Sequence, residues 1–373
     1  MKILMFSYEF PPIGGGASRV VEGLCRNLVR SGDEVDLLTM RFDGLPREEH
    51  IDGLHVHRVP CIRRRKHYCT VPEVATYLAM AFGTEVRQAI QRRPDLVHAH
   101  FIFPDGLLAW CVAAVVGVPF VITAHGTDVP GYDPKRVQLT HKLLAPLWRR
   151  VVGSAAEIVC PSDSLLQLTA EHGPGARLSV IPNGVDPDRF RLVPKQPRIL
   201  VVTRLLERKG IQFLIQALQQ ISLDWEVNIV GDGPYLPALL KLARTTKTPV
   251  RFRGWMDNDS TELRELYETS SVFVLPSESE NFPICLLEAM AASHSIITTR
   301  DTGCAEVVGS AAWLVDPRDP EGIQDALLTL TNDAGRRNAL GQKARNRVQN
   351  NFSWSAVAQQ YRALYRRHVD VGS

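Results

Sequence analysis

Two carboxylates at a fixed spacing are the clearest candidates for chemistry in this sequence. Glu280 and Glu288 are eight positions apart, and Pro283 stands between them. The apolar run 272–275 predicts a buried strand, and Pro283 is favoured in a helix's first turn, so Glu288 lies about one and a half turns into that helix. Both carboxylates then lie at the carboxyl end of a sheet. Their oxygens accept hydrogen bonds from sugar or ribose hydroxyls.

A pair of cations brackets the first strand-to-helix loop in the second half of the chain. Arg204 and Lys209 stand on either side of this loop, where a Rossmann unit binds phosphate. Together they would neutralise a diphosphate. Ordinary solvated charge is the alternative, and we favour it for Arg208 between them. Gly233, after the next predicted strand, keeps the same edge free of side chains.

A glycine-rich loop follows the first predicted strand. Gly14, Gly15 and Gly16 precede a predicted helix, and such a loop lets backbone N–H groups approach a phosphate at the helix N-terminus. Arg19 occupies the position where the dinucleotide fingerprint requires its third glycine, which argues against a nicotinamide dehydrogenase. A plain tight turn is the alternative.

Histidines stand near the ends of two predicted strands. His125 begins a short polar segment that ends in Asp128, and it directly follows the predicted strand 119–124. A histidine there is expected to face the ligand site of an α/β protein, with a structural role in the turn as the alternative. His98 and His100 alternate along the preceding strand. No third metal ligand stands near them, so we expect them in the core or at an interface.

Composition restricts the classes of protein that fit. A chain of 373 residues favours two domains, and 45% hydrophobic with 22% charged residues is typical of a soluble globular protein. The net charge of +3 and the absence of a known motif argue against nucleic-acid binding. The seven cysteines show no zinc spacing, so we expect free thiols in a reducing, cytoplasmic setting and no metal.

Neither the start of the chain nor any apolar window predicts membrane insertion. The first ten residues are too soon interrupted for a signal peptide and predict a strand, and no window reaches ~18 apolar residues. The basic run Arg63–Lys66 lies in a predicted loop. Solvated charge is the common role of such a run, but it could also contact anionic lipid head groups at the inner face of the membrane.

Strand and helix patterns alternate in two successive sets, which predicts parallel βαβ units and two Rossmann-like domains. Strands are predicted at 2–7, 34–40, 54–59, 95–99, 119–124, 157–161, 178–182, 198–203, 225–230, 250–253, 271–275, 295–299 and 312–315. Helices are predicted at 17–31, 72–92, 105–116, 136–152, 163–172, 209–221, 234–246, 260–269, 283–292, 319–331 and 335–350. A proline-rich gap over 186–197 predicts the linker. We therefore divide the chain into domains 1–187 and 188–352 and a final helix within 353–373.

Together these segments resemble the family 4 retaining glycosyltransferases of the GT-B fold. The similarity runs from residue 2 to about 365. It rests on motifs that occur in the family's order: the loop 11–19, the segment 125–128, the segment 181–186, Arg204 with Lys209 and Gly210, and the pair Glu280 and Glu288, with Arg253 and Gly254 as a further match.

The resemblance implies an α/β fold of two Rossmann-like domains that face each other across a deep interdomain cleft. It also implies that the helix from Ser353 returns to the first domain, that this domain binds the acceptor, and that the second binds a nucleotide-sugar. The chain departs from the family at Ser293-His294-Ser295 and at Gly303-Cys304-Ala305-Glu306. The second departure lies near the transferred sugar and leaves its identity open.

The resemblance also implies roles for single residues. Arg204 and Lys209 would hold the donor's diphosphate, Glu280 the transferred sugar, Glu288 the ribose, and His125 would lie by the sugar and acceptor. The residues implied in catalysis are Arg204, Lys209, Glu280 and His125. Those implied in donor binding are Gly15, Gly16, Arg204, Lys209, Gly233, Gly254, Glu280, Asn281, Phe282, Pro283 and Glu288. Those implied in acceptor binding are Arg19, His125 and Asp128.

The expected reaction moves a sugar from a nucleoside diphosphate, such as UDP or GDP, to the hydroxyl of a glycan, a lipid-linked acceptor or a small molecule, with retention of configuration. No Asp-x-Asp stands at a strand end, so we expect no cofactor and no metal, with Arg204 and Lys209 in the metal's place. A nucleotide-sugar epimerase of the same fold and a non-catalytic sugar-nucleotide-binding protein are the alternatives.

Overall fold

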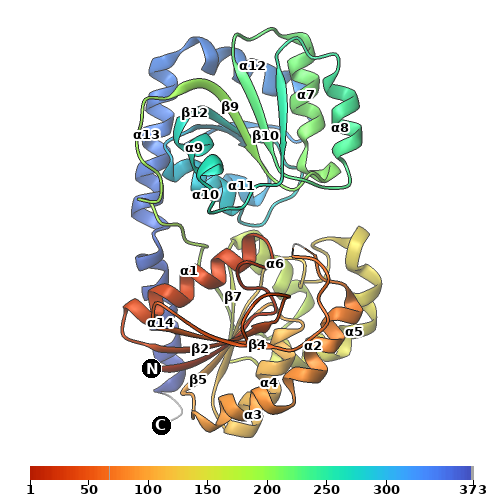
Figure 1. The fold of residues 1–373 in the computed structure, drawn as a ribbon, viewed down its shortest axis with the longest axis vertical. Coiled ribbons are helices and arrows are strands. Elements are labelled where there is room, and N and C mark those ends of the chain that lie inside the picture. Colours follow the sequence, from red (N-terminus) through yellow and green to blue (C-terminus); the bar gives the residue numbers. More distant parts are fainter. Residues whose placement is uncertain (67, 371–373) are drawn as a thin grey trace. The chain divides into compact units, whose positions relative to one another are not determined.

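The computed structural model describes residues 1–66 and 68–370. The chain forms two compact units, each built on a largely parallel sheet flanked by helices (Figure 1). The first unit contains Met1–Gly184 and the chain from Trp354 onward, and the second contains Val185–Ser353. The division lies slightly before the expected one at 187/188.

The sheet of the first unit has eight strands. These are β1 (Lys2–Phe6), β2 (Glu34–Met40), β3 (Glu48–Ile51), β4 (Leu54–Val59), β5 (Leu96–His100), β6 (Phe120–Thr123), β7 (Glu157–Cys160) and β8 (Leu178–Val180). Their order is β3-β4-β2-β1-β5-β6-β7-β8, and all pairs are parallel except the antiparallel pair β3–β4. The short edge strand β3 was not predicted, because its charged, half-exposed residues show no apolar alternation.

Helices cover both faces of this sheet. They are α1 (Gly16–Arg30), α2 (Val71–Ala81), α3 (Thr84–Gln91), α4 (Asp105–Val116), α5 (Pro134–Ser154), α6 (Asp163–His172) and α14 (Trp354–Val369). Alternate residues of β1 enter different cores: Leu4 and Phe6 pack in one cluster, and Ile3 and Met5 in the other. Burial on both faces explains the continuous apolar run of this strand.

The terminal helix α14 belongs to the first unit, where it packs beside α1. Tyr361 and Tyr365 are buried in the same cluster as Leu24 of α1. The first residue of α14, Trp354, lies against glycine: a Cβ at Gly23 would stand 2.1 Å from its ring. The helix therefore fills the face of the sheet that lies across from α2, α4 and α5.

The second unit has a parallel sheet with the order β11-β10-β9-β12-β13-β14. Its strands are β9 (Gln196–Val202), β10 (Glu226–Val230), β11 (Val250–Gly254), β12 (Ser270–Leu275), β13 (Ser295–Thr299) and β14 (Trp313–Val315). Its helices are the 3-10 turn η1 (Glu207–Lys209), α7 (Ile211–Gln220), α8 (Leu236–Ala243), α9 (Thr261–Thr269), α10 (Ile284–Ala291), α11 (Gly303–Val308), α12 (Pro320–Asn332) and α13 (Ala334–Asn351).

Three helix predictions differ from the structure. The predicted helix 72–92 is two helices, α2 and α3, which are separated at Phe82 and Gly83. The predicted helix 209–221 is broken at Gly210, whose φ of 71° is left-handed. The short helix α11 was not predicted, because six residues are too few to show a helical period.

The linker prediction over 186–197 was wrong. Phe190 is buried in a core cluster of the second unit, and Arg191 forms an ion pair with Glu268 at 2.9 Å. Lys195 donates hydrogen bonds to backbone carbonyls, among them that of Ala292 at 2.7 Å. The prolines interrupt the helical and strand periods, but the segment still packs as part of the second unit.

Two further sequence expectations concern cysteines and membrane segments. Each of the seven cysteines is a free thiol, as expected. Across residues 1–66 and 68–370, none of the helices has both the length and the apolar character that crossing a bilayer requires.

Candidate active site

Close backbone packing at glycines shapes the carboxyl-end loops of the second unit. A Cβ at Gly210 would lie 1.9 Å from the carbonyl oxygen of Pro276, and a Cβ at Gly233 would lie 2.3 Å from that of Leu205. The loops after β9, β10 and β12 therefore contact one another through their main chains. Arg204 is exposed in the first of these loops. The carboxyl edge of this sheet therefore consists mainly of backbone, with a few side chains such as Arg204 beside it.

Lys209 and Glu280 are brought together at this edge. The Lys209 ammonium forms an ion pair with a Glu280 carboxylate oxygen, and their side chains are 12% and 9% exposed. Ser277 Oγ donates a hydrogen bond to the same oxygen at 2.8 Å. The cation predicted to hold a diphosphate and the carboxylate predicted to contact the sugar thus form one partly buried, hydrogen-bonded pair.

Glu288 lies within α10 and is 8% exposed. Its Oε1 accepts a hydrogen bond from Arg189 Nη1 at 3.1 Å, and its Oε2 accepts one from the Tyr267 hydroxyl at 3.1 Å. Burial and the nearby Glu288 charge raise the pKa of Tyr267 well above its usual value, so its hydroxyl stays a donor. Arg189 was not predicted, since a lone arginine in an irregular segment carries no periodic signal.

The segment between the two glutamates is held in place before α10 begins. Asn281 and Phe282 are buried, and Pro283 is the N-cap of α10. The amide of Gly303 donates to the carbonyl of Glu280 at 3.1 Å, and a Cβ at Gly303 would stand 1.5 Å from the Asn281 carbonyl. This glycine therefore allows the loop after β13 to lie directly on the Glu280 loop.

Two other predicted or unusual positions lie at strand and helix ends of this unit. Gly254 ends β11 with a φ of 70°, and its carbonyl accepts the Gly231 amide at 2.8 Å. Ser293, where the chain departs from the family, has a φ of 61°. It thus adopts the left-handed conformation that favours glycine, at a cost of roughly 1–2 kcal/mol.

The first unit places its glycine loop at the N-terminus of α1. Gly15 is the N-cap of this helix, no side chain caps it, and no acidic residue stands in its first turn, which starts at Gly16. Gly14, with a φ of 99°, donates its amide to the Lys66 carbonyl at 2.8 Å. An uncapped helix N-terminus without acidic side chains suits an anion. Arg19 pairs with Glu22 at 2.9 Å.

His125 lies beside His100, which was predicted to lie in the core or at an interface. His125 Nε2 and His100 Nδ1 are 3.1 Å apart, and the His125 ring packs on Phe101 with centroids 4.4 Å apart. Burial lowers the pKa of His125 to about 3 and that of His100 well below its usual value. Both imidazoles are therefore neutral near pH 7.

Asp128 positions this histidine loop. Its Oδ1 accepts the amide of His125 at 2.9 Å, and its Oδ2 accepts the amide of Ile102 at 2.8 Å. The side chain is 6% exposed. Both carboxylate oxygens thus accept hydrogen bonds from backbone amides. This favours a positioning role for Asp128 over the direct acceptor contact expected from the sequence.

The basic run Arg63–Lys66 differs from the expectation at its first residue. Arg63 is 6% exposed and lies 3.6 Å from Glu9, with a hydrogen bond to the Tyr8 carbonyl at 3.4 Å. It therefore supports the glycine loop from inside, because its guanidinium bonds backbone and a carboxylate there. The other three residues of the run, Arg64, Arg65 and Lys66, are exposed.

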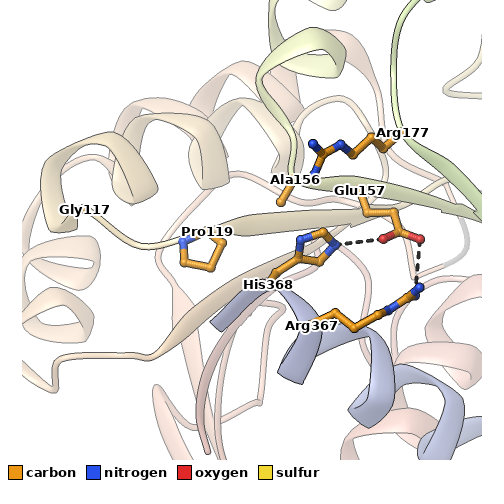
Figure 2. A pocket seen from close by; sticks show the side chains of 7 residues that line it. All are labelled: Gly117, Pro119, Ala156, Glu157, Arg177, Arg367 and His368. Atoms are coloured by element: carbon orange, nitrogen blue, oxygen red, sulfur yellow. Dashed lines mark hydrogen bonds and ion pairs between the residues drawn. The ribbon is translucent and has the colours of Figure 1, made fainter. Parts of the chain in front are cut away.

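A pocket of about 600 Å³ lies at the amino-terminal edge of the first unit's sheet, opposite the edge that carries the predicted site residues. Figure 2 shows His368 of α14 directed at Glu157, with their Nε2 and Oε2 atoms 2.8 Å apart. Arg367 approaches the other oxygen of Glu157 at 3.6 Å. The pocket starts where β6, β7 and β8 begin, so it contains none of the predicted site residues, which follow strand ends.

Comparison with known proteins identifies the family of this chain. The model of Glycosyltransferase Family 4 matches residues 14–189, and that of Glycosyl transferases group 1 matches residues 196–333. The glycogen synthase of Mycobacterium tuberculosis is 30% identical over 396 residues, which cover 96% of this chain and 92% of that protein.

Solved structures show the same fold over the full length. The sucrose-phosphate synthase of Thermosynechococcus elongatus superposes with a TM-score of 0.84 at 23% identity, with full coverage of both chains. The Anabaena protein HepE, solved with UDP-glucose, gives a TM-score of 0.74 at 16% identity and covers 98% of this chain and 100% of its own. The fold is GT-B, and the chain belongs to the family 4, or group 1, glycosyltransferases, a family of enzymes.

Proposed function

We propose that this enzyme transfers a sugar from a nucleoside-diphosphate sugar to an acceptor hydroxyl with retention of the anomeric configuration. The partly buried pair of Lys209 and Glu280 carries the proposal, because a cation that suits a diphosphate lies beside a carboxylate that suits sugar hydroxyls. The UDP-glucose held by HepE supports a nucleotide-sugar donor. The acceptor is a glycan, a lipid-linked sugar or a small molecule.

The departing diphosphate is stabilised by charges that the fold already holds in place. Lys209 has three N–H donors, so it can keep its bond to Glu280 and still donate to a phosphate oxygen. Arg204 and the N-terminus of α10 near Pro283 add positive potential in the same unit. These groups take the place of a metal ion.

Glu288 binds the ribose hydroxyls in this proposal. Each carboxylate oxygen has more than one acceptor site, so Glu288 can accept from ribose while Arg189 and Tyr267 hold it. Two fixed partners keep the carboxylate in one orientation. The ribose then meets a preorganised acceptor.

His125 takes a role as a neutral hydrogen-bonding group. With a pKa of about 3, its imidazole is a weak base at neutral pH. We therefore assign the acceptor's proton to an oxygen of the leaving diphosphate. His125 orients hydroxyls of the sugar or acceptor, and Asp128 holds it there through its backbone amide.

A donor screen tests the proposal. The purified protein is incubated with UDP-, GDP- and ADP-sugars and a panel of acceptors in the presence of EDTA, and the release of nucleoside diphosphate and the anomeric configuration of the product are measured by NMR. A glycoside of retained configuration is expected. A free epimerised donor indicates an epimerase, binding without turnover indicates a sensor, and an inverted product refutes retention.

The exposed part of the basic run extends this proposal to lipid-linked acceptors. Arg64, Arg65 and Lys66 are exposed next to Ile62 (56% exposed) and Tyr68 (41% exposed). Cations beside apolar side chains favour contact with anionic membranes. Flotation with anionic vesicles should fall strongly for Arg64→Glu with Arg65→Glu, and equal flotation of wild type and variant would exclude this surface.

A further inference from the structure

A polar cluster lies on one face at the edge of the first unit's sheet. Asp36 on β2 is paired in register with His55 on β4. His57 is two residues further along β4, so its side chain is on the same face as that of His55. Asp36 and His55 lie in the amino-terminal halves of their strands, and His57 lies near the middle of β4. The groups of the proposed reaction follow the carboxyl ends of strands, so the cluster is separate from them.

The three ligand-type atoms converge at distances that suit a metal ion. Asp36 Oδ1 lies 2.9 Å from His55 Nδ1, His55 Nδ1 lies 3.0 Å from His57 Nε2, and His57 Nε2 lies 3.9 Å from Asp36 Oδ1. Three tetrahedral ligands at about 2.0–2.1 Å from Zn²⁺ are roughly 3.3 Å apart. The observed distances bracket this value, so a small adjustment of side chains completes one face of a coordination sphere.

Burial and the surrounding charges also favour a cation at this place. The side chains of Asp36, His55 and His57 are 23%, 13% and 6% exposed, so water competes little for their lone pairs. Glu48 Oε1 on β3 lies 3.6 Å from His57 Nδ1. A carboxylate near the second nitrogen of a ligating histidine is a common outer partner that orients the ring.

Arg92 shows that the cluster already attracts positive charge. Its guanidinium contacts both Asp36 Oδ1 and His55 Nδ1. Arg92 stands in the turn after α3, and its side chain is 40% exposed, so it can turn toward solvent without loss of core packing. An arginine and a metal ion would compete for the same two ligand atoms.

We propose that Asp36, His55 and His57 form a binding site for a first-row transition metal ion of the Zn²⁺ class, with water as the remaining ligand. Two imidazoles and one carboxylate are ligands that such ions prefer. The ion replaces the guanidinium of Arg92. Its ligands come from β2 and β4, and the outer partner Glu48 comes from β3. The ion therefore stabilises the pairing of these strands at the edge of the sheet.

Direct metal binding tests this site. Chelator-treated full-length protein is titrated with Zn²⁺ by calorimetry, and its thermal unfolding is followed with and without the ion. One Zn²⁺ per chain and a higher Tm are expected. Co²⁺ is used as a spectroscopic probe, because nitrogen and oxygen ligands give d–d bands without the thiolate charge-transfer band that a cysteine site would show.

Variants assign the ion to these residues. Asp36→Asn, which keeps the shape of the side chain, and His57→Ala should each weaken Zn²⁺ binding by roughly 100-fold, and Glu48→Gln by roughly tenfold. Arg92→Ala should strengthen binding by roughly tenfold, because it removes the competing cation. His172→Ala on α6 is the matched control and should bind as the wild type does.

Three results would overturn the proposal. These are no Zn²⁺ binding by the folded wild type, a thiolate band with Co²⁺, or unchanged affinity in folded Asp36→Asn and His57→Ala. If those two variants fail to fold by circular dichroism, Arg92→Ala decides: tighter binding supports the site, and equal or weaker binding leaves an ion-pair cluster only.

Discussion

Lys209 and Glu280, 71 positions apart, form an ion pair at the carboxyl edge of the second unit's sheet. The contact depends on Gly210, whose missing side chain allows the loop after β9 to lie on Pro276. A buried charge that loses its partner is costly, whereas a pair that is removed together often is not. This pair therefore offers a way to separate stability from catalysis.

Single and double substitutions of this pair should differ in their effect on stability but lower activity equally. Lys209→Met leaves a mostly buried carboxylate without its cation and should lower the free energy of unfolding by roughly 3–5 kcal/mol. Lys209→Met with Glu280→Gln should recover most of that loss. Transfer should fall by roughly 10²–10³ in both, because the phosphate contact is absent.

Denaturant unfolding and initial rates with the preferred donor measure these effects. Lys241→Met on α8 controls for loss of a lysine elsewhere in the unit. Near-normal transfer by folded Lys209→Met would remove this lysine from the reaction.

Removal of the Glu288 carboxylate should weaken nucleotide binding itself. Glu288→Gln keeps the size of the side chain but loses the charge that accepts from ribose, so affinity for the nucleoside diphosphate should fall by roughly ten- to 100-fold. Calorimetry with the nucleotide alone measures this. Glu265→Gln, on the exposed face of α9, is the control. Unchanged affinity in Glu288→Gln would place ribose elsewhere.

A side chain at Gly23 should displace the terminal helix. A Cβ there would lie 2.1 Å from the Trp354 ring, so Gly23→Val forces Trp354 away and opens the cluster around Tyr361 and Tyr365. Overpacking of this kind costs roughly 1–3 kcal/mol, visible as a lower Tm. Gly153→Ala in α5, where no atom lies within 4 Å of the added Cβ, should not lower Tm. Equal Tm values for both variants would contradict the packing.

Acid should destabilise the first unit through its buried histidines. Burial lowers the pKa of His98 to about 3, from an unfolded value near 6.5. Between these values the unfolded chain binds a proton that the folded chain does not, so stability is complete above pH 6.5 and falls as pH decreases. His98 alone contributes a slope of about 1.4 kcal/mol per pH unit.

His98→Gln should reduce this slope by that amount, since an amide does not titrate and can still bond the Thr123 and Tyr365 hydroxyls. Chemical unfolding at intervals between pH 6 and 4 measures it. Identical slopes in variant and wild type would show that His98 titrates normally.

Much of the fold was predictable because buried parallel strands and their helices carry strong periodic signals. The strands β2, β4 and β13 have the predicted bounds, and the remaining predicted strands differ only at their ends. The two elements that were missed are short: β3 has four mostly charged residues, and α11 has six residues, too few to show a helical period. The linker prediction failed because prolines restrict backbone conformation but do not indicate whether a segment packs against a domain.

The order and spacing of the motifs by themselves determined the family and the candidate site residues, because such motifs consist of residue types at fixed local spacings. Only tertiary structure decided the partners of those groups. Four contacts join residues that are separated in the chain. They are the ion pairs of Lys209 with Glu280, of Arg189 with Glu288 and of Arg63 with Glu9, and the cluster of Asp36 with two histidines. Such contacts are set by how strands align in a sheet and where glycine lets loops touch, which local sequence does not encode.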